Sequence, residues 1–275
     1  MVYSLVEQQR GFTLVELIIT IVMLSILAVG SIQFVSFSAQ SYVQTVERSH
    51  HSNQASIINE KISRKLRNAL PNSIRVTTDG ACVEWIEIIS ASLYIQAPVL
   101  GSSSPDGEVQ IIPVDGALPN TGYVTISPNQ VSPLLYDNSR NPGSITPIPA
   151  VFTGTLGNIS VYSIASGFRF EYGSAQQRLY FTSSPKAFCQ QGNYLFSYEN
   201  YGFVGDVSNL FSSLPSSLPN RKLISDSLIT NSLQFSSGSS SLRRNSLLTY
   251  SYILRSGSSD ERLVVNQEVQ IRNVP

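Results

Sequence analysis

The sequence is poor in charge. Only 13% of its 275 residues are charged, about half the usual share of a soluble domain, and 18 basic residues balance 18 acidic ones. A protein that binds DNA or RNA needs a basic field, so this balance argues against nucleic acid as a partner. With 42% hydrophobic residues, the chain is also too apolar to be disordered throughout.

Cysteine and histidine are equally scarce, with two residues of each. Two cysteines exclude a disulfide-dense scaffold and a four-cysteine zinc site, and two histidines limit most histidine-based metal chemistry. The sequence contains no nucleophile elbow, no phosphate-binding loop and no metal-binding helix motif. We therefore expect a non-enzymatic protein with no catalytic residues, no metal site and no cofactor.

Hydrophobic residues are concentrated near the N-terminus. The segment 12–37 is almost wholly apolar and long enough to cross a bilayer as a helix, and no residue between Glu16 and Glu47 is charged. A secretory signal peptide is one interpretation, but the run exceeds a usual signal core and no small-residue cleavage site closes it. A plain membrane anchor is another, but Glu16 places a carboxylate inside the apolar helix, where a charge is costly and marks a function.

The residues around Glu16 resemble a known processing signal. The run Arg10-Gly11-Phe12-Thr13-Leu14-Val15-Glu16 resembles the class III signal of type IV prepilins and pseudopilins. In that family a short polar leader ends in Gly, Phe usually follows, and Glu is fifth in the mature chain. Gly11, Phe12 and Glu16 match these three positions. The resemblance implies that a membrane prepilin peptidase cleaves after Gly11 and that the new amine of Phe12 is N-methylated.

The same resemblance gives Glu16 a role in assembly. An ionised carboxylate inside a bundle of apolar helices needs a cation nearby. In pilins the implied cation is the terminal amine of a neighbouring subunit, which here is the amine of Phe12. Such a pair would favour docking in one register over all others.

A helical pattern continues beyond the apolar segment. Apolar residues recur at spacings of three and four, and Pro71 then gives a stop; the recurring residues are Ala55, Ile58, Ile62, Leu66, Ala69 and Leu70. Basic residues lie mostly on the other faces and predict a solvated helix surface: Lys61, Arg64, Lys65 and Arg67. We expect one helix from near Phe12 to Leu70, in which residues 12–37 form the membrane or filament core and the amphipathic residues 38–70 extend to a sheet.

After Pro71 the hydrophobic period changes from 3.6 to 2, which predicts a β-rich head over residues 72–275. The expected strands are Ser73–Thr77, Cys82–Ile89, Leu93–Gln96, Val109–Ile112, Tyr123–Ile126, Ile159–Ile164, Phe168–Tyr172, Arg178–Phe181, Tyr194–Tyr198, Leu247–Leu254 and Arg262–Ile271. The last two are expected to form a hairpin. The predicted fold class is α+β and type IV pilin-like: a long, partly transmembrane N-terminal helix packed on an antiparallel β-rich head, after a leader of residues 1–11.

Two segments of the head differ in composition. Residues 98–149 hold nine of the 14 prolines, which predicts an irregular insertion with short edge strands, because proline cannot donate to a β-ladder. Residues 208–245 are rich in serine and predict flexible loops.

A second resemblance narrows the family. Leu66–Val76, Cys82–Ile89 and Arg262–Pro275 resemble MshO-type minor pilins of the MSHA (mannose-sensitive haemagglutinin) pilus, although the resemblance is weak over residues 98–165 and 205–245. It implies a minor pilin that acts in pilus assembly, initiation or tip structure. The implied partners are prepilin peptidase, other pilins of the filament, the inner-membrane assembly platform and the lipid bilayer.

The resemblance also implies a location and a redox state. The chain would cross the inner membrane once, with its N-terminus cytoplasmic and its head periplasmic, before it enters the pilus at the cell surface. In that oxidising compartment we expect Cys82 and Cys189 to form a disulfide, with two buried free thiols as the alternative. Two other functions stay open: a minor pseudopilin of a type II secretion system, and a membrane-anchored glycan-binding or adhesive module.

Overall fold

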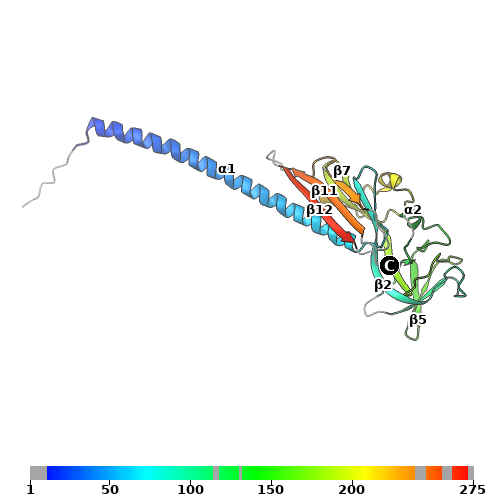
Figure 1. The fold of residues 1–275 in the computed structure, drawn as a ribbon. Helices are drawn as coiled ribbons and strands as arrows, with labels where there is room; N and C mark the ends of the chain where they lie inside the picture. The colour runs from blue at the N-terminus through cyan, green and yellow to red at the C-terminus, as the bar shows by residue number, and fades with distance from the viewer. Residues whose placement is uncertain (1–10, 114–117, 130–131, 239–245, 256–261, 272–275) are drawn as a thin grey trace, which may run out of the picture. The chain divides into compact units, whose positions relative to one another are not determined.

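The computed structural model describes residues 11–113, 118–129, 132–238, 246–255 and 262–271. The helical elements are α1 (Leu14–Arg67), α2 (Ser132–Leu135), the 3-10 turn η1 (Val207–Asn209) and α3 (Leu210–Ser213). The strands are β1 (Arg75–Val76), β2 (Cys82–Gln96), β3 (Glu108–Ile112), β4 (Thr121–Ile126), β5 (Ala150–Leu156), β6 (Ile159–Ser163), β7 (Arg178–Gln191), β8 (Tyr194–Tyr198), β9 (Arg221–Ser225), β10 (Gln234–Ser237), β11 (Ser246–Arg255) and β12 (Arg262–Ile271). A long N-terminal helix followed by an antiparallel β head is the α+β, type IV pilin-like fold that the sequence predicted (Figure 1).

Helix α1 ends at Arg67, three residues before the predicted end at Leu70. The reason is that the next residues hydrogen-bond to β2 instead of continuing the helix. The N–H of Leu70 donates to the carbonyl of Ile86 at 2.7 Å, and the N–H of Ile88 donates to the carbonyl of Asn68 at 2.9 Å. The chain divides into two compact units between Ser52 and Asn53, so the last turns of α1 belong to the head.

Within the head, the predicted apolar stripe of α1 is buried. Ile58, Ile62 and Leu66 are in one core cluster with Trp85 of β2 and Phe188 of β7. The same cluster contains side chains of β10, β11 and β12, so both sheets of the head contribute to the surroundings of the helix. The helical spacing of the sequence therefore identified the core-facing side of this part of α1 correctly.

The larger sheet of the described chain is wholly antiparallel, with strand order β1-β2-β3-β6-β5-β4-β7-β8-β9. An additional pairing of β2 with β7 closes a ring through β2, β3, β6, β5, β4 and β7. Side chains of these six strands build most of a second apolar cluster, which includes Val109, Val124, Tyr162 and Phe181. The two largest apolar clusters of the described head thus lie against α1 and within the ring.

The smaller sheet has the order β10-β11-β12, and β11 and β12 form the antiparallel hairpin that the sequence predicted. Two tyrosines of β11 contact α1 through hydrogen bonds. The hydroxyl groups of Tyr250 and Tyr252 lie 3.2 and 3.0 Å from Oδ1 of Asn59, and the Tyr252 hydroxyl also donates to the carbonyl of Ala55 at 3.2 Å. Because α1 supplies these acceptors, the small sheet is oriented on the helix by polar as well as apolar contacts.

The proline-rich segment departs from the prediction of edge strands. Its two strands, β3 and β4, each pair on both sides: β3 with β2 and β6, and β4 with β5 and β7. All nine prolines of the segment lie outside these strands, so the strands keep their backbone donors.

Several other predictions also changed. The strand predicted at Ser73–Thr77 is shorter and the one at Arg178–Phe181 is longer, and β9 and β10 lie in the segment 208–245, where flexible loops were predicted. The two strands expected within residues 82–96 are one strand, β2, because Ser90–Leu93 continue its pairing with β7. The strand predicted at Phe168–Tyr172 is absent, because Phe170 makes only isolated bridges to Val99 and Gly143. Strand β5 was not predicted; most of its residues are exposed, so it lacks an alternating apolar pattern.

Candidate functional site

The residues that match the processing signal lie together at the start of α1. Gly11, Phe12 and Thr13 precede the helix, and Glu16 lies in its first turn. The carbonyl of Thr13 accepts the N–H of Leu17 at 3.2 Å, and its hydroxyl oxygen accepts the N–H of Glu16 at 3.3 Å. Thr13 is therefore the N-cap, and a Thr three residues before a Glu is the sequence of a capping box.

The apolar segment behind this cap is exposed along its whole length. Every residue from Gly11 to Gln40 is exposed, including Phe12 at 71%. In water such a surface would be unfavourable by about 25 cal/mol per Å² of apolar area left unburied. Among the described residues, α1 is the one helix long and apolar enough to cross a membrane. Its surface therefore requires a bilayer or other apolar helices as surroundings.

The carboxylate of Glu16 has no hydrogen-bond or ion-pair partner among the residues that the structure describes. Its position near the N-terminus of a helix favours negative charge, because the first N–H groups point toward it.

A model of the prokaryotic N-terminal methylation motif matches residues 8–32, which include Gly11, Phe12 and Glu16. This match supports the type IV prepilin and pseudopilin family. The prepilin motif implies processing by a prepilin peptidase and assembly with other pilins, which are structural proteins. The apolar helix behind the motif is consistent with membrane anchoring. No curated protein and no solved structure is significantly similar to the chain.

The two cysteines are far from the processing motif in sequence and form a disulfide in the head. Cys82 opens β2 and lies directly opposite Cys189 of β7, with the two sulfur atoms 2.04 Å apart and the Cα atoms 4.2 Å apart. Both are buried in a small cluster with Ala187, Tyr198 and Leu210. The disulfide therefore joins the two longest strands of the ring.

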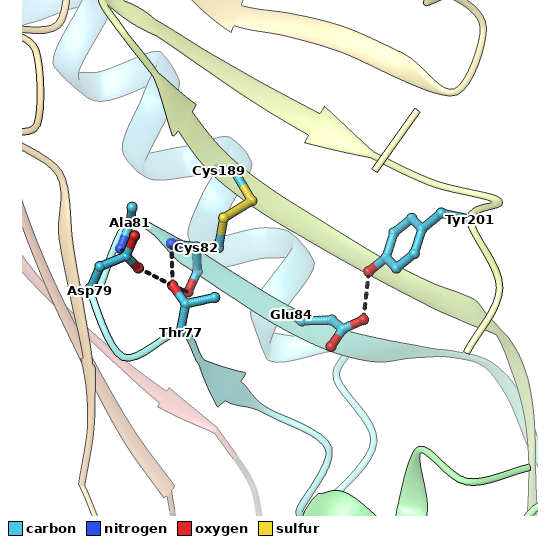
Figure 2. The surroundings of a disulfide bond; sticks show 7 residues. All are labelled: Thr77, Asp79, Ala81, Cys82, Glu84, Cys189 and Tyr201. Atoms are coloured by element: carbon cyan, nitrogen blue, oxygen red, sulfur yellow. Dashed lines mark hydrogen bonds between the residues drawn. A yellow bond between two sulfur atoms is a disulfide. The ribbon is translucent and has the colours of Figure 1, made fainter. Parts of the chain in front are cut away.

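The turn before Cys82 is held by hydrogen bonds, as Figure 2 shows. The N–H of Cys82 donates to the hydroxyl of Thr77 at 3.0 Å, and that hydroxyl donates to Asp79 at 2.6 Å. The hydrogen bond from Thr77 holds the pKa of Asp79 below its ordinary value. Gly80 follows with a φ of +72°, and a Cβ there would lie 2.5 Å from Oε1 of Gln234, so this turn requires glycine.

A buried ion pair joins Arg75 of β1 to Glu84 of β2, two residues after Cys82. Nε of Arg75 is 2.5 Å from Oε2 of Glu84, and the two side chains are 5% and 0% exposed. The Tyr201 hydroxyl donates to the other oxygen of Glu84 at 2.8 Å, as Figure 2 shows, and Arg75 also donates to the carbonyls of residues 204 and 205. Cζ of Arg75 lies 3.6 Å from the centre of the Tyr136 ring. These contacts fix the segment 201–205 to the strands.

Burial raises the pKa of Glu84, although the charge and hydrogen bond of Arg75 oppose the rise. A raised carboxyl pKa is often a sign of a catalytic acid. Here both oxygens of Glu84 are engaged and no part of the side chain reaches solvent, so the group is structural. In the described part of the chain, no three His, Cys, Asp or Glu residues are grouped as a metal site would require.

Sequence reasoning missed two of these features. The capping role of Thr13 had a visible signal, the Thr-x-x-Glu spacing of Thr13 and Glu16. The ion pair of Arg75 and Glu84 had only a weak signal, a basic and an acidic residue that each have apolar neighbours in the sequence. Its third member, Tyr201, is separated from Glu84 by 117 residues, which no local pattern connects.

Proposed function

We propose that this chain is a minor pilin of a type IV pilus of the MSHA type, which acts in pilus assembly, initiation or tip structure. The observation that carries the proposal is the exposed apolar half of α1 directly behind a prepilin motif. In this role the helix leaves the bilayer and packs among the helices of neighbouring pilins. The head then caps, primes or decorates the filament.

We propose Gly11 and Phe12 as the processing site. Prepilin peptidase cleaves after Gly11, and the amine of Phe12 becomes methylated. The substitution Gly11→Val should block cleavage, so intact-mass spectrometry should find the 11-residue leader still attached. Gly30→Val is the matched control, because an added Cβ meets no atom within 4 Å at either glycine; it should be processed normally. Processing of the Gly11→Val variant would contradict the assignment.

We propose that Glu16 pairs with the Phe12 amine of an adjacent subunit. The isosteric change Glu16→Gln removes the charge and should abolish incorporation into the sheared filament fraction, while cleavage after Gly11 continues. Glu16→Asp keeps the charge on a shorter side chain and should retain part of the incorporation. If Glu16→Gln is incorporated as well as the unsubstituted protein, the pairing is wrong.

The decisive experiment is a deletion of the gene, followed by a count of sheared surface pili and an assay of secreted exoproteins in the same cultures. Loss of pili with normal secretion supports the minor pilin. Loss of secretion with normal pili instead supports a minor pseudopilin of a type II secretion system, which has the same motif. If both are normal, binding of glycans or cells by the head becomes the function to test.

A further inference from the structure

The head contains a half-open cavity of about 350 Å³ between the last turns of α1 and the neighbouring strands. Its walls come from α1, from β2 and β7, and from the β8–β9 region, so residues from four separate parts of the sequence form it. All of them belong to the compact unit that begins at Asn53. Cavities of about 300–1,000 Å³ are the size that small-molecule ligands occupy.

The cavity is strongly basic in a chain that has no net charge. Its lining includes five cationic side chains: Lys61, Arg64, Lys65, Lys186 and Lys222. Two carboxylates offset them. Glu87 pairs with both Lys65 and Lys186, and Glu199, which also lines the cavity, pairs with Lys222. A net positive charge of three therefore remains at this one place.

Two of the cations are not engaged. Lys61 and Arg64 are exposed and have no ion-pair partner among the described residues. They project from α1 at positions three residues apart, which lie on the same side of a helix. The sequence predicted that they form a solvated helix face, and both are exposed; the structure shows that they also line the cavity.

Aromatic residues form part of the lining of the cavity. Trp85 and Tyr198 are among them, and both are about 1% exposed. The Tyr198 side chain packs with Cys82 and Ala187 on the other face of the sheet, so its hydroxyl contributes no donor to the cavity. Nε1 of Trp85 has no hydrogen-bond partner within the described chain. A buried donor without a partner costs free energy, so such atoms are normally paired with protein, water or a ligand.

The mixture of groups limits the chemistry of a ligand. Cations without ion-pair partners favour an anionic group such as a carboxylate in the ligand. The hydroxyl of Ser197 and the carboxylate of Glu199, which is paired with Lys222, line the same cavity. Both groups accept hydrogen bonds from hydroxyl groups of a ligand. We propose that this cavity binds a carboxylate-bearing sugar of one or two rings, such as a uronic acid. This site is independent of the processing motif and of the proposed role in pilus assembly.

The chain provides its own reporter for a test. Trp85 is the only tryptophan of the sequence, and it lines the cavity. The full chain in non-ionic detergent would be titrated with sodium glucuronate while the Trp85 emission is followed, with glucose as the neutral control. Saturation-transfer NMR on the same samples detects bound sugar even where the fluorescence does not change. We expect saturable binding of glucuronate in the millimolar range and none of glucose.

Substitutions then locate the site. Arg64→Gln should weaken glucuronate binding about tenfold, because a charge-assisted hydrogen bond is lost. Arg67→Gln is the matched control, since Arg67 is exposed on the same helix but does not line the cavity; its affinity should stay within about twofold. Raising the salt concentration should weaken binding to the unsubstituted protein.

Several results would overturn the proposal. Absence of glucuronate binding by both methods would do so, as would equal effects of Arg64→Gln and Arg67→Gln. Phosphate that binds as tightly as glucuronate would show a general oxyanion site. A triglutamate peptide that binds where glucuronate does not would show a site for an acidic segment of a protein partner.

Discussion

The two parts of α1 differ in what surrounds their apolar side chains. Ile26, in the first part, is 64% exposed, whereas Ile62, in the part that belongs to the head, is fully buried. Backbone hydrogen bonding is the same in both, because α1 is one helix. The difference shows that, within the described part of the chain, apolar partners are present only for the second part.

The hydrophobic pattern of the sequence also differs between the two parts of α1. The first part is apolar on all sides, which is typical of a helix surrounded by lipid or by other helices. The second part has an apolar stripe and polar faces, which is typical of a helix at the edge of a core. We therefore expect the head to be stable by itself and the first part of α1 to depend on lipid or other helices.

The largest effect is expected from the disulfide. The double substitution Cys82→Ala and Cys189→Ala opens a loop with a sequence separation of 107 residues. A loop of that length is worth about 4–5 kcal/mol in the chain-entropy model. We expect the free energy of unfolding of the head, followed by Trp85 fluorescence in detergent, to fall by about that amount. Reduction of the unsubstituted protein should give the same midpoint, and the helical signal of the first part should persist.

The same substitution in each part of α1 compares the two parts directly by its effect on the stability of the head. Ile62→Ala leaves a cavity in the core beside Trp85 and should cost the head about 2–5 kcal/mol. Ile26→Ala removes the same atoms from an exposed position and should change the unfolding of the head by less than about 0.5 kcal/mol. Equal effects in denaturant titrations would show that the two parts of α1 fold as one unit.

A smaller effect is expected at the cap. Thr13→Ala removes the acceptor of the Glu16 N–H and should weaken the first turn of α1 by about 1 kcal/mol. Faster hydrogen exchange of the amides at residues 14–17 would report it, and the unfolding midpoint of the head should not change. Thr20→Ala is the control, because the Thr20 hydroxyl bonds a carbonyl within the helix and caps nothing. Unchanged exchange in Thr13→Ala would contradict the capping role.

The smallest effect concerns the carboxylate that ties α1 to the sheet. Burial opposes ionisation of Glu87, but the hydrogen bonds and charges of Lys186 and Lys65 together hold its pKa below the ordinary value. A lowered pKa stabilises the folded state above the unfolded pKa, and this contribution is lost as the pH falls through the folded pKa. The free energy of unfolding should therefore decrease below about pH 4.5, and less steeply in Glu87→Gln.

Glu84, on the same strand as Glu87, should have the opposite effect on how stability depends on pH. Because burial raises its pKa, its contribution is present below the unfolded pKa and is lost as the pH rises through the folded pKa. Removing it in Glu84→Gln should steepen the loss of stability in acid. Identical acid slopes in the unsubstituted protein and both variants would contradict these assignments.

Much of the fold could be read from local patterns. The stripe of Ile58, Ile62 and Leu66 predicted the buried side of α1, and the bounds of Tyr194–Tyr198 and Arg262–Ile271 are those of β8 and β12. The stripe of α1 follows the helical period, and β8 and β12 follow a period of 2 in part.

The remainder depends on contacts between distant residues. Phe168 and Phe170 looked like a strand because they alternate, but both are buried in the second core cluster without a continuous ladder. The closed ring of strands arises from the pairing of β2 with β7, about a hundred residues apart, which no local pattern encodes. The motif proposed as the processing site is local instead, because Gly11, Phe12 and Glu16 are neighbours in sequence.

The disulfide also decides how the head responds to a pulling force. A load applied between α1 and β12 enters the head close to Cys82 and must pass through the bond between Cys82 and Cys189. The disulfide bypasses the backbone between the two cysteines, so about 350 Å of contour length does not contribute to the extension. Strands β3 to β6 lie inside this loop, whereas β8 to β12 lie outside it. Under load the strands inside the loop are therefore not extended, and only the segments outside the loop can unfold mechanically.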